Sequence, residues 1–311
     1  MTDASVASGA RIADYWLHEE VPARNTELAY LASHRVLPRR AHIAILAPAF
    51  VGCRPAEVQL MREACVLETM HHCGVPRVFE CGVVDHRPWV ASESIVGTTI
   101  EEAAAERPLP IPEALAVIRD AAAILAHAHR RGIVHRDLTP SSIVRTVDRG
   151  LPICLTGWGE ASMHGSTLPR PDNPGARFYR APELTDGDRS GHCDPAIDVF
   201  ALGAVIFEAA TLVLPEPVQR FPGVPAALHQ LLARMLAPSP GDRPTAQAVH
   251  DEASRLAELF TGSDAGIEEV EVELVDISRT QSPTQALGWM PDCIVTLAGE
   301  TLGTQPRRRG P

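Results

Sequence analysis

The chain has 311 residues, of which 45% are hydrophobic, so it can bury a large core in one two-lobed domain or in two smaller ones. No stretch reaches the roughly 20 apolar residues of a membrane-spanning helix, and the N-terminus lacks the basic and then apolar layout of a signal peptide. We therefore expect a soluble, cytoplasmic protein. A net charge of −11 argues against a nucleic-acid partner, because such binding depends on clustered basic residues.

The cysteines favour a reducing compartment. There are seven, an odd number, and none forms a CxxC pair, which is typical of free thiols and not of a disulfide framework. They are Cys53, Cys65, Cys73, Cys81, Cys154, Cys193 and Cys293. Three of them lie near His71 and His72 in the sequence, but the spacing matches no zinc pattern, so no metal is expected there.

Between residues 12 and 97 the chain alternates β-like runs with one helical stretch. The preceding residues, 1–11, are expected to be disordered. Turn-bounded runs predict strands over residues 42–46, 76–84 and 88–95. Residues 55–70 space their apolar side chains as one face of a helix does, and a helix is predicted there.

From about residue 98 the pattern becomes helical. An amphipathic helix is predicted over residues 111–132, with Pro112 and Glu113 in its first turn and Gly132 at its end. Further predictions are β-type segments at 142–147 and 152–157, a buried helix at 198–212 and a helix at 225–237. Residues 261–311 are acidic and then rich in Ser, Thr and Pro, and are expected to form a mostly disordered tail.

Four short motifs occur in a specific order along the chain. They are HRDLTPSSI at residues 135–143, APE at 181–183, DVFALG at 198–203 and DRP at 242–244. In order and spacing they resemble the bacterial eukaryotic-like (Hanks-type) Ser/Thr protein kinases over residues 12–260. The resemblance implies an α+β, bilobal fold with a small β-rich N-lobe (12–97) and a larger helical C-lobe (98–260).

The resemblance also assigns scaffold roles, and the residues that fill them are present. Glu183 is expected to form a largely buried salt bridge with Arg243. Asp198 is expected to accept hydrogen bonds from backbone N–H groups of the HRD loop. An apolar column joining the lobes is expected from Leu67, Val78, His135 and Trp158.

The residues that handle ATP in this family are largely missing. Phosphoryl transfer depends on positioning and on countercharge at the phosphates and the metal. All 28 basic residues are arginine, and Leu46 stands where the family's lysine should contact the phosphates. Glu63, which would pair with that lysine, is expected to be an exposed carboxylate without a partner. Gly157 replaces the aspartate that binds magnesium, and Ser142 replaces the second metal ligand.

Two more features of the family's site are altered. Residues 19–32 align with the glycine-rich loop but contain no glycine, and acids such as Glu27 would repel ATP. Ala176 stands where a threonine usually contacts the catalytic aspartate. That aspartate, Asp137, is retained with its neighbour Arg136, but Asp137 is not expected to sustain useful turnover by itself. Neither ATP nor Mg²⁺ is therefore expected as a cofactor.

Three functions stay open from the residues. The first is a pseudokinase that serves as a signalling scaffold or allosteric binding module for a protein partner, such as an active kinase, in an undetermined oligomeric state. In that function a true kinase could phosphorylate Ser162, Ser166 or Thr167, and Arg136 could pair with the phosphate.

The other two functions keep a ligand. A divergent active Ser/Thr kinase would use ATP and Mg²⁺, with Glu160 as the metal carboxylate and an arginine at the phosphates. The candidate arginines are Arg35, Arg39 and Arg40. A sensor would instead bind a nucleotide or another small molecule without metal, in the candidate cleft formed by Ala44, Glu63, Glu93 and Ile95.

Overall fold

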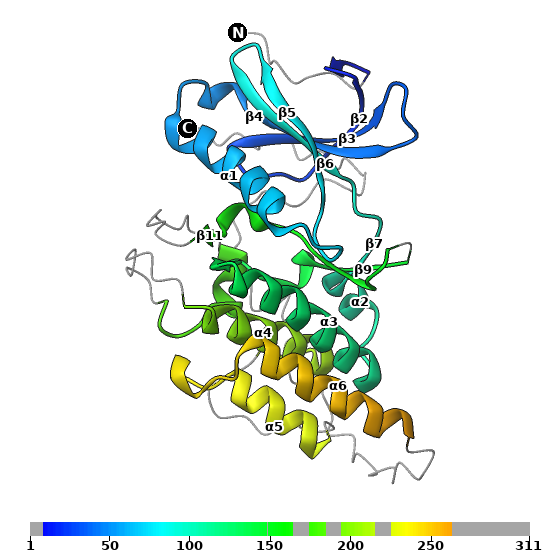
Figure 1. Cartoon of the computed structure of the whole chain (residues 1–311), viewed down its shortest axis with the longest axis vertical. Helices are drawn as coiled ribbons and strands as arrows, with labels where there is room; N and C mark the ends of the chain where they lie inside the picture. The colour runs from blue at the N-terminus through cyan, green and yellow to red at the C-terminus, as the bar shows by residue number, and fades with distance from the viewer. Residues whose placement is uncertain (1–8, 148, 164–173, 185–193, 215–224, 263–311) are drawn as a thin grey trace, which may run out of the picture. The chain divides into compact units, whose positions relative to one another are not determined.

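The computed structural model describes residues 9–147, 149–163, 174–184, 194–214 and 225–262. These residues form a β-rich N-terminal lobe and a mainly helical C-terminal lobe (Figure 1). The α+β, bilobal fold expected from the motifs is therefore confirmed.

The N-lobe is an antiparallel sheet of six strands in the order β1-β2-β3-β4-β6-β5. The strands are β1 (Arg11–Ile12), β2 (Tyr15–Val21), β3 (Glu27–His34), β4 (Arg40–Leu46), β5 (Val78–Val84) and β6 (Arg87–Glu93). Side chains alternate between the two faces of a strand. Ala41, Ile43 and Ile45 of β4 therefore enter one apolar core. His42, Ala44 and Leu46 lie on the opposite face.

One helix, α1 (Arg54–Met70), packs on that second face of the sheet (Figure 1). It starts with a proline in its first turn and ends at His71, which takes a left-handed φ of 44°. Ala56, Leu60 and Ala64 pack against Leu46 in a second apolar cluster. This packing fixes the rotation of α1 and turns its polar face, which carries Glu63, away from that cluster.

The C-lobe is built from five helices in the described part of the chain, together with short strands. The helices are α2 (Ile100–Glu106), α3 (Ile111–Arg130), α4 (Ala196–Thr211), α5 (Ala226–Met235) and α6 (Ala246–Gly262). Helix α4 lies at the centre with most of its residues buried, as its uniformly apolar sequence predicts. Helix α6 lies along α3 (Figure 1).

Short strands and single turns connect these helices. The strands are β7 (Gly97–Thr99), β8 (Ile133–Val134), β9 (Ile143–Thr146), β10 (Ile153–Leu155) and β11 (Ser162–Met163). They form a β10-β9-β7 sheet and a β11-β8 pair. The turns are η1 (Pro48–Phe50), η2 (Pro140–Ser142), η3 (Trp158–Glu160), η4 (Pro174–Tyr179) and η5 (Pro240–Asp242). This arrangement places η3 against α1, and places His135 of the HRD loop against Trp158 of η3.

The ends of the domain differ slightly from the expected bounds. β1 begins at Arg11, inside the segment expected to be disordered, and α6 runs to Gly262. Residues 1–8 and the expected tail beyond Gly262 lie outside the described residues. Within the described ranges, no helix has both the length and the apolar character needed to cross a bilayer.

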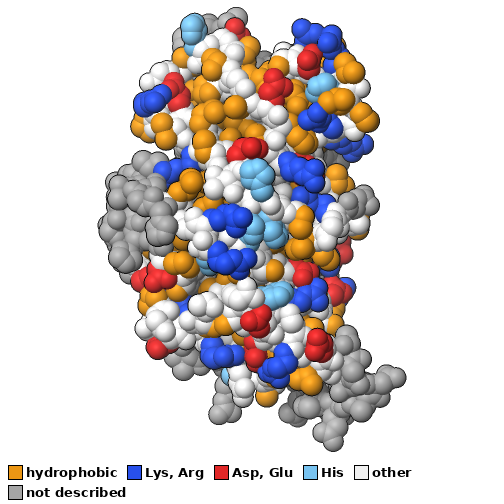
Figure 2. Space-filling model, viewed as in Figure 1, with side chains coloured by type: hydrophobic (Ala, Val, Ile, Leu, Met, Phe, Trp, Pro, Cys, Tyr) orange, Lys and Arg blue, Asp and Glu red, His pale blue; other side chains and the backbone are white. Residues whose placement is uncertain are grey.

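Charged side chains are unevenly spread over the face drawn in Figure 2. Arginine and histidine side chains gather across its middle, between the two lobes. The chain as a whole carries a net charge of −11. This grouping of basic side chains contrasts with the acidic balance of the whole chain.

Candidate functional site

Asp198, in the first turn of α4, organises the HRD loop. Its side chain is 1% exposed and accepts backbone N–H bonds from His135 and Arg136, each at 2.8 Å. His129 Nε2 lies 2.8 Å from the same carboxylate. Burial alone would raise the pKa of Asp198, but His129, His135 and the backbone hydrogen bond lower it overall. The hydrogen bonds expected at Asp198 are therefore present.

Glu183 and Arg243 form the expected salt bridge. It is bidentate, with Nη1–Oε1 at 2.6 Å and Nη2–Oε2 at 2.7 Å. The Arg243 side chain is fully buried, whereas that of Glu183 is 27% exposed, so only the arginine end lies out of water. Arg243 also donates to the backbone carbonyls of Ala196, Ala237 and Pro238. It thereby fixes the start of α4 to the segment before η5.

The apolar column between the lobes is also present. The rings of His135 and Trp158 have centroids 4.5 Å apart, at an interplanar angle of 60°. Trp158 is fully buried and donates from Nε1 to the Leu155 carbonyl at 2.8 Å. Leu67 shares the same core cluster, and Val78 packs against it.

Gly157 and Ser142, which the resemblance leads us to expect at metal-ligand positions, lie side by side, and neither offers a carboxylate. Gly157 takes a left-handed φ of 78°, and a Cβ built on it would lie 3.8 Å from the Ser142 Cβ. The Ser142 hydroxyl donates to the Thr139 carbonyl at 2.8 Å and accepts from the Thr139 N–H at 2.9 Å. Within the described ranges, no group of three or more His, Cys, Asp or Glu side chains is arranged to hold a metal ion.

The structure places at the centre of this site an arginine that sequence reasoning missed. Arg24 lies between β2 and β3, in the segment aligned with the glycine-rich loop. Its guanidinium donates to Glu63 at 2.7 Å and to Glu27 at 3.1 Å. The expectation that Glu63 lacks a partner is therefore wrong, because a loop arginine has taken the place of a strand lysine. The available signal was that Arg24 is the sole arginine within residues 19–32.

Arg24 also lies directly against Gly159, in the segment TGWG. A Cβ on Gly159 would overlap Nη2 of Arg24, so the guanidinium has room at this position because the residue is glycine. Burial opposes the charge of Arg24, but Glu63 and then Glu27 outweigh it and raise the pKa of the guanidinium. Arg24 therefore stays charged and links the β2–β3 loop to α1 and η3.

The neighbours of Arg24 are mostly acidic. Glu160 in η3 accepts a hydrogen bond from Gln59 of α1. Burial raises the pKa of Glu160, with Arg24 opposing and Asp137 reinforcing this shift. Burial likewise raises the pKa of Glu27, with Arg24 opposing it. Three carboxylates, those of Glu27, Glu63 and Glu160, thus act on one guanidinium.

Strand β4 provides no cation that could replace the missing lysine. Leu46 is fully buried in the apolar cluster against α1, and Ala44 packs on the same cluster. The third inward position is His42, which sequence reasoning also missed. Burial lowers the pKa of His42, and Glu63 only partly offsets this effect, so the imidazole is neutral at pH 7. None of the three inward positions therefore carries a positive charge toward Glu63.

The proposed replacement arginines lie elsewhere. Arg35 pairs with Asp14 at 3.2 Å, and Arg39 stacks on Phe79 with its guanidinium carbon 4.7 Å from the ring centre. Arg40 is exposed at the start of β4. The arginine that reaches Glu63 is therefore Arg24 and not one of these three.

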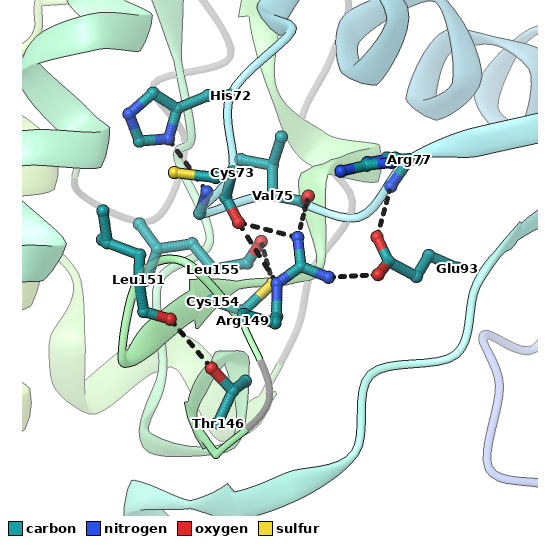
Figure 3. A network of polar contacts seen from close by, with 11 residues as sticks. His72, Cys73, Val75, Arg77, Glu93, Thr146, Arg149, Leu151, Cys154 and Leu155 are labelled. Carbon is teal, nitrogen blue, oxygen red and sulfur yellow. Dashed lines mark hydrogen bonds and ion pairs between the residues drawn. The ribbon is translucent and has the colours of Figure 1, made fainter.

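The remaining candidates of the cleft are engaged outside this cluster. Glu93, at the end of β6, forms an ion pair with Arg149 Nη1 at 2.5 Å (Figure 3). Ile95 follows it and is half-buried. Neither residue is among the groups that act on Arg24.

The predicted phosphorylation sites have different outcomes. Ser162 is fully buried in β11, and its hydroxyl has no hydrogen-bond partner in the described part of the chain. Phosphorylation at Ser162 would require the β8–β11 pairing to open. Ser166 and Thr167 lie outside the described residues, and so does the side chain of Ala176, whose backbone lies in η4.

Comparison with protein families gives a match to the protein kinase domain over residues 53–253. The kinase PknI of Mycobacterium tuberculosis is 29% identical over 252 residues, which cover 77% of this chain and 41% of PknI. PknJ of the same organism is 26% identical over 286 residues, which cover 84% of this chain and 48% of PknJ. This chain thus spans less than half the length of these curated relatives.

Solved structures give the same picture. The crystal structure of the M. tuberculosis PknI kinase domain matches with a TM-score of 0.61 and 26% sequence identity. The match covers 81% of this chain and 99% of that one.

A third curated relative comes from another organism. The Ser/Thr kinase PrkC of Bacillus subtilis is 31% identical over 189 residues, which cover 60% of this chain and 28% of PrkC.

Proposed function

The chain belongs to the protein kinase domain family, and we propose that it is a pseudokinase. In this function the kinase fold works as a signalling scaffold or allosteric binding module, with little or no phosphotransfer. The observation that carries this proposal is the cluster around Arg24. Its one guanidinium is already bound to Glu63 and Glu27 and lies against Gly159. This is the region in which the family places phosphates and metal.

The charges in this region oppose a bound triphosphate. Catalysis of phosphoryl transfer rests on cations at the phosphates and on carboxylates that hold Mg²⁺. One guanidinium, that of Arg24, serves three carboxylates, with Arg136 acting on Glu160 alone, and the expected metal positions are Gly157 and Ser142. Removing a single electrostatic donor from an active site typically lowers the rate by about 100- to 1,000-fold. Several such losses together leave too little transition-state stabilisation for useful turnover, even though Asp137 is retained.

The scaffold side of the proposal rests on how α1 is held. Gln59 bonds to Glu160, Arg62 lies 3.4 Å from the Ala161 carbonyl, and Glu63 is tied through Arg24 to η3. Side chains of the protein itself therefore hold α1 against the C-lobe. We propose that this fixed surface, within residues 12–260, binds a signalling protein in the cytoplasm, and that the tail over 261–311 is a separate segment.

An active Ser/Thr kinase with a rearranged site is the second candidate. The Arg24–Glu63 ion pair favours it, because an arginine beside the helix glutamate could also contact phosphate. The retained Asp137 favours it as well, and so do the relatives, which are named Ser/Thr kinases. In this reading Glu160 would have to leave Gln59 and hold the metal.

Titration of the purified full chain with ATP and Mg²⁺ separates these functions, if melting temperature and phosphate release are followed in the same samples. The scaffold proposal expects no magnesium-dependent shift and no release above that of Asp137→Asn. A magnesium-dependent shift with release that is lost in Asp137→Asn would overturn it in favour of the active kinase. A nucleotide shift that needs no Mg²⁺ and gives no release would point to a sensor.

Gly159→Ala provides a charge-neutral probe of Arg24 in the same assay. The new methyl group would push the guanidinium away without adding or removing a charge. Gly241→Ala is the matched control, because the nearest atom to its Cβ would be the Ser239 hydroxyl at 3.9 Å. A pseudokinase stays inactive in both variants, whereas an enzyme that relies on Arg24 loses activity in Gly159→Ala only.

A further inference from the structure

Basic side chains form a strip where the end of α3 meets the loop between α1 and β5. The strip consists of Arg77, Arg149, His72, His127, Arg131 and Arg130. In the same way, arginine and histidine side chains gather between the lobes on the face shown in Figure 2. The pseudokinase proposal makes no use of any of these residues.

Hydrogen bonds and a ring contact make the basic strip continuous. Arg149 donates to the carbonyls of Cys73 at 2.7 Å and Val75 at 2.9 Å (Figure 3). On the other side of this loop, the rings of His72 and His127 have centroids 4.6 Å apart. Arg131 Nη1 lies 3.3 Å from His127 Nδ1. Contacts therefore run from Arg149, across the loop, to the end of α3.

The hydrogen bonds of the two histidines show what the strip offers to a ligand. The Gly74 N–H donates to His72 Nδ1 at 3.0 Å, so the proton of a neutral His72 lies on Nε2. His127 Nδ1 accepts from Arg131, and its Nε2 donates to the Met70 carbonyl at 2.6 Å. Arg130 and Arg131 are exposed. The strip therefore presents N–H donors to solvent.

The electrostatic balance of the strip is positive. Burial lowers the pKa of His72, and its basic neighbours His127, Arg131 and Arg130 reinforce this shift. The carboxylate bound to the strip is that of Glu93, which pairs with Arg149. Among the residues that the structure describes, one carboxylate, that of Glu93, thus forms an ion pair with one of the four arginines of the strip, in a chain whose net charge is −11.

We propose that this basic strip docks an acidic segment of a partner protein. Carboxylates complement a row of N–H donors, and arginine binds them with charge-assisted hydrogen bonds. The acidic remainder of the chain repels an acidic segment, whereas the strip attracts it. Electrostatic steering therefore directs the segment to the strip. Nucleic acid is disfavoured because its affinity depends on many phosphate contacts, and the strip offers four arginines. The proposal goes beyond the scaffold function, since it holds for an active kinase as well.

Fluorescence anisotropy of the full chain with labelled decaglutamate tests this proposal, with decaglutamine as the uncharged probe. We expect decaglutamate to bind, and its affinity to fall as salt rises. Salt screens exposed ion pairs, with a Debye length of about 10 Å at 0.1 M. The double variant Arg130→Gln, Arg131→Gln should weaken binding roughly tenfold. Arg234→Gln, Arg255→Gln removes the same charge from α5 and α6 and should leave binding nearly unchanged.

Three results would overturn the proposal. Equal weakening in both double variants would show that net charge alone attracts the peptide. Absence of binding at low salt would show that the strip is only a solvated surface. Tighter binding of a single-stranded oligonucleotide that depends on Arg130 and Arg131 would assign the strip to nucleic acid.

Imidazole NMR adds an independent readout, because bound carboxylates should raise the pKa of His72.

Discussion

The charged residues expected from the resemblance are present and paired in the C-lobe, whereas those expected between the lobes are largely replaced. In the C-lobe, Asp198 and the Glu183–Arg243 pair hold loops to α4, and every expected contact is present. Between the lobes, the positions expected to face phosphate and metal carry the uncharged residues Leu46, Gly157 and Ser142, and Arg24 reaches from a loop to pair with Glu63. The fold has therefore kept the charges that satisfy its own backbone and side chains.

The difference follows from what each charge contacts. Asp198 accepts two buried backbone N–H groups, which would otherwise stay unpaired, so its loss destabilises the fold directly. A lysine or aspartate that contacts only ATP or metal contributes nothing of this kind to the folded chain. Glu63 is intermediate, because a helix carboxylate facing the other lobe needs a cation, and Arg24 provides it.

Removing Asp198 should have the largest effect on stability. Asp198→Ala leaves the N–H groups of His135 and Arg136 buried without a partner and removes the acceptor of His129. We expect a loss of about 3–5 kcal/mol in the free energy of unfolding, measured by urea denaturation. Asp251→Ala, at an exposed carboxylate of α6, should change it by less than about 0.5 kcal/mol. Similar values for the two variants would contradict the scaffold role of Asp198.

Removing Arg24 should have the next largest effect. Arg24→Ala leaves Glu27 and Glu63 close together with no cation, so we expect a loss of about 2–3 kcal/mol in the free energy of unfolding. Arg35→Ala is the matched control, because it breaks an ion pair whose side chains are 52% and 51% exposed. That loss should stay below about 1 kcal/mol. If both variants unfold alike, the Arg24 cluster is no more than a surface ion pair.

Arg149→Ala should give a smaller and more local effect. It removes the ion pair to Glu93 and the hydrogen bonds to Cys73 and Val75, from a side chain that is 13% exposed. We expect a loss of about 1–2 kcal/mol in the free energy of unfolding, together with faster amide exchange in residues 71–77. Arg54→Ala, whose side chain is 83% exposed, should produce neither change. Unchanged exchange in Arg149→Ala would show that the loop does not depend on this arginine.

The smallest predicted effect depends on pH. Because burial raises the pKa of Glu160 in the folded chain, its protonated form stabilises the fold below the unfolded value of about 4.3, and this stability is lost as pH rises through the folded value. The stability of Glu160→Gln, relative to that of the wild type, should therefore increase as pH rises from about 4.5 to 7. We expect a gain of about 1–3 °C in melting temperature at pH 7.

Glu252→Gln is a control of opposite sign. A hydrogen bond from Arg255 lowers the pKa of Glu252, so the wild type gains stability as pH rises above that lowered value. The glutamine variant should therefore fall behind the wild type as pH rises from the lowered value to the unfolded value of about 4.3, and the difference should stay constant above it. If both variants shift in the same direction, the buried environment of Glu160 is not the cause.

The fold was more predictable than the site because its signals are local or carried by motifs. The helices at Arg54–Met70 and Ile111–Arg130 showed clear periodicity and terminal prolines. The contacts of Asp198 and Arg243 followed from short motifs. Helix α2 was missed, although the capping box formed by Thr99 and Glu102 marked its start.

The site was less predictable because its central contact joins distant segments. The Arg24–Glu63 hydrogen bond spans 39 positions and depends on the conformation of the β2–β3 loop. Neither periodicity nor family spacing indicates which arginine will fill the place of a missing lysine. The room for that guanidinium at Gly159 appears only once both lobes are in place.

Calorimetric titration of the wild type and Arg24→Ala with ATP, with and without Mg²⁺, tests the central claim most directly. If Arg24 belongs to the fold and not to a phosphate site, the wild type shows no magnesium-dependent binding at millimolar ATP, and Arg24→Ala binds no more weakly. Magnesium-dependent binding by the wild type at micromolar ATP, weakened tenfold or more in Arg24→Ala, would contradict this account and identify Arg24 as a phosphate ligand.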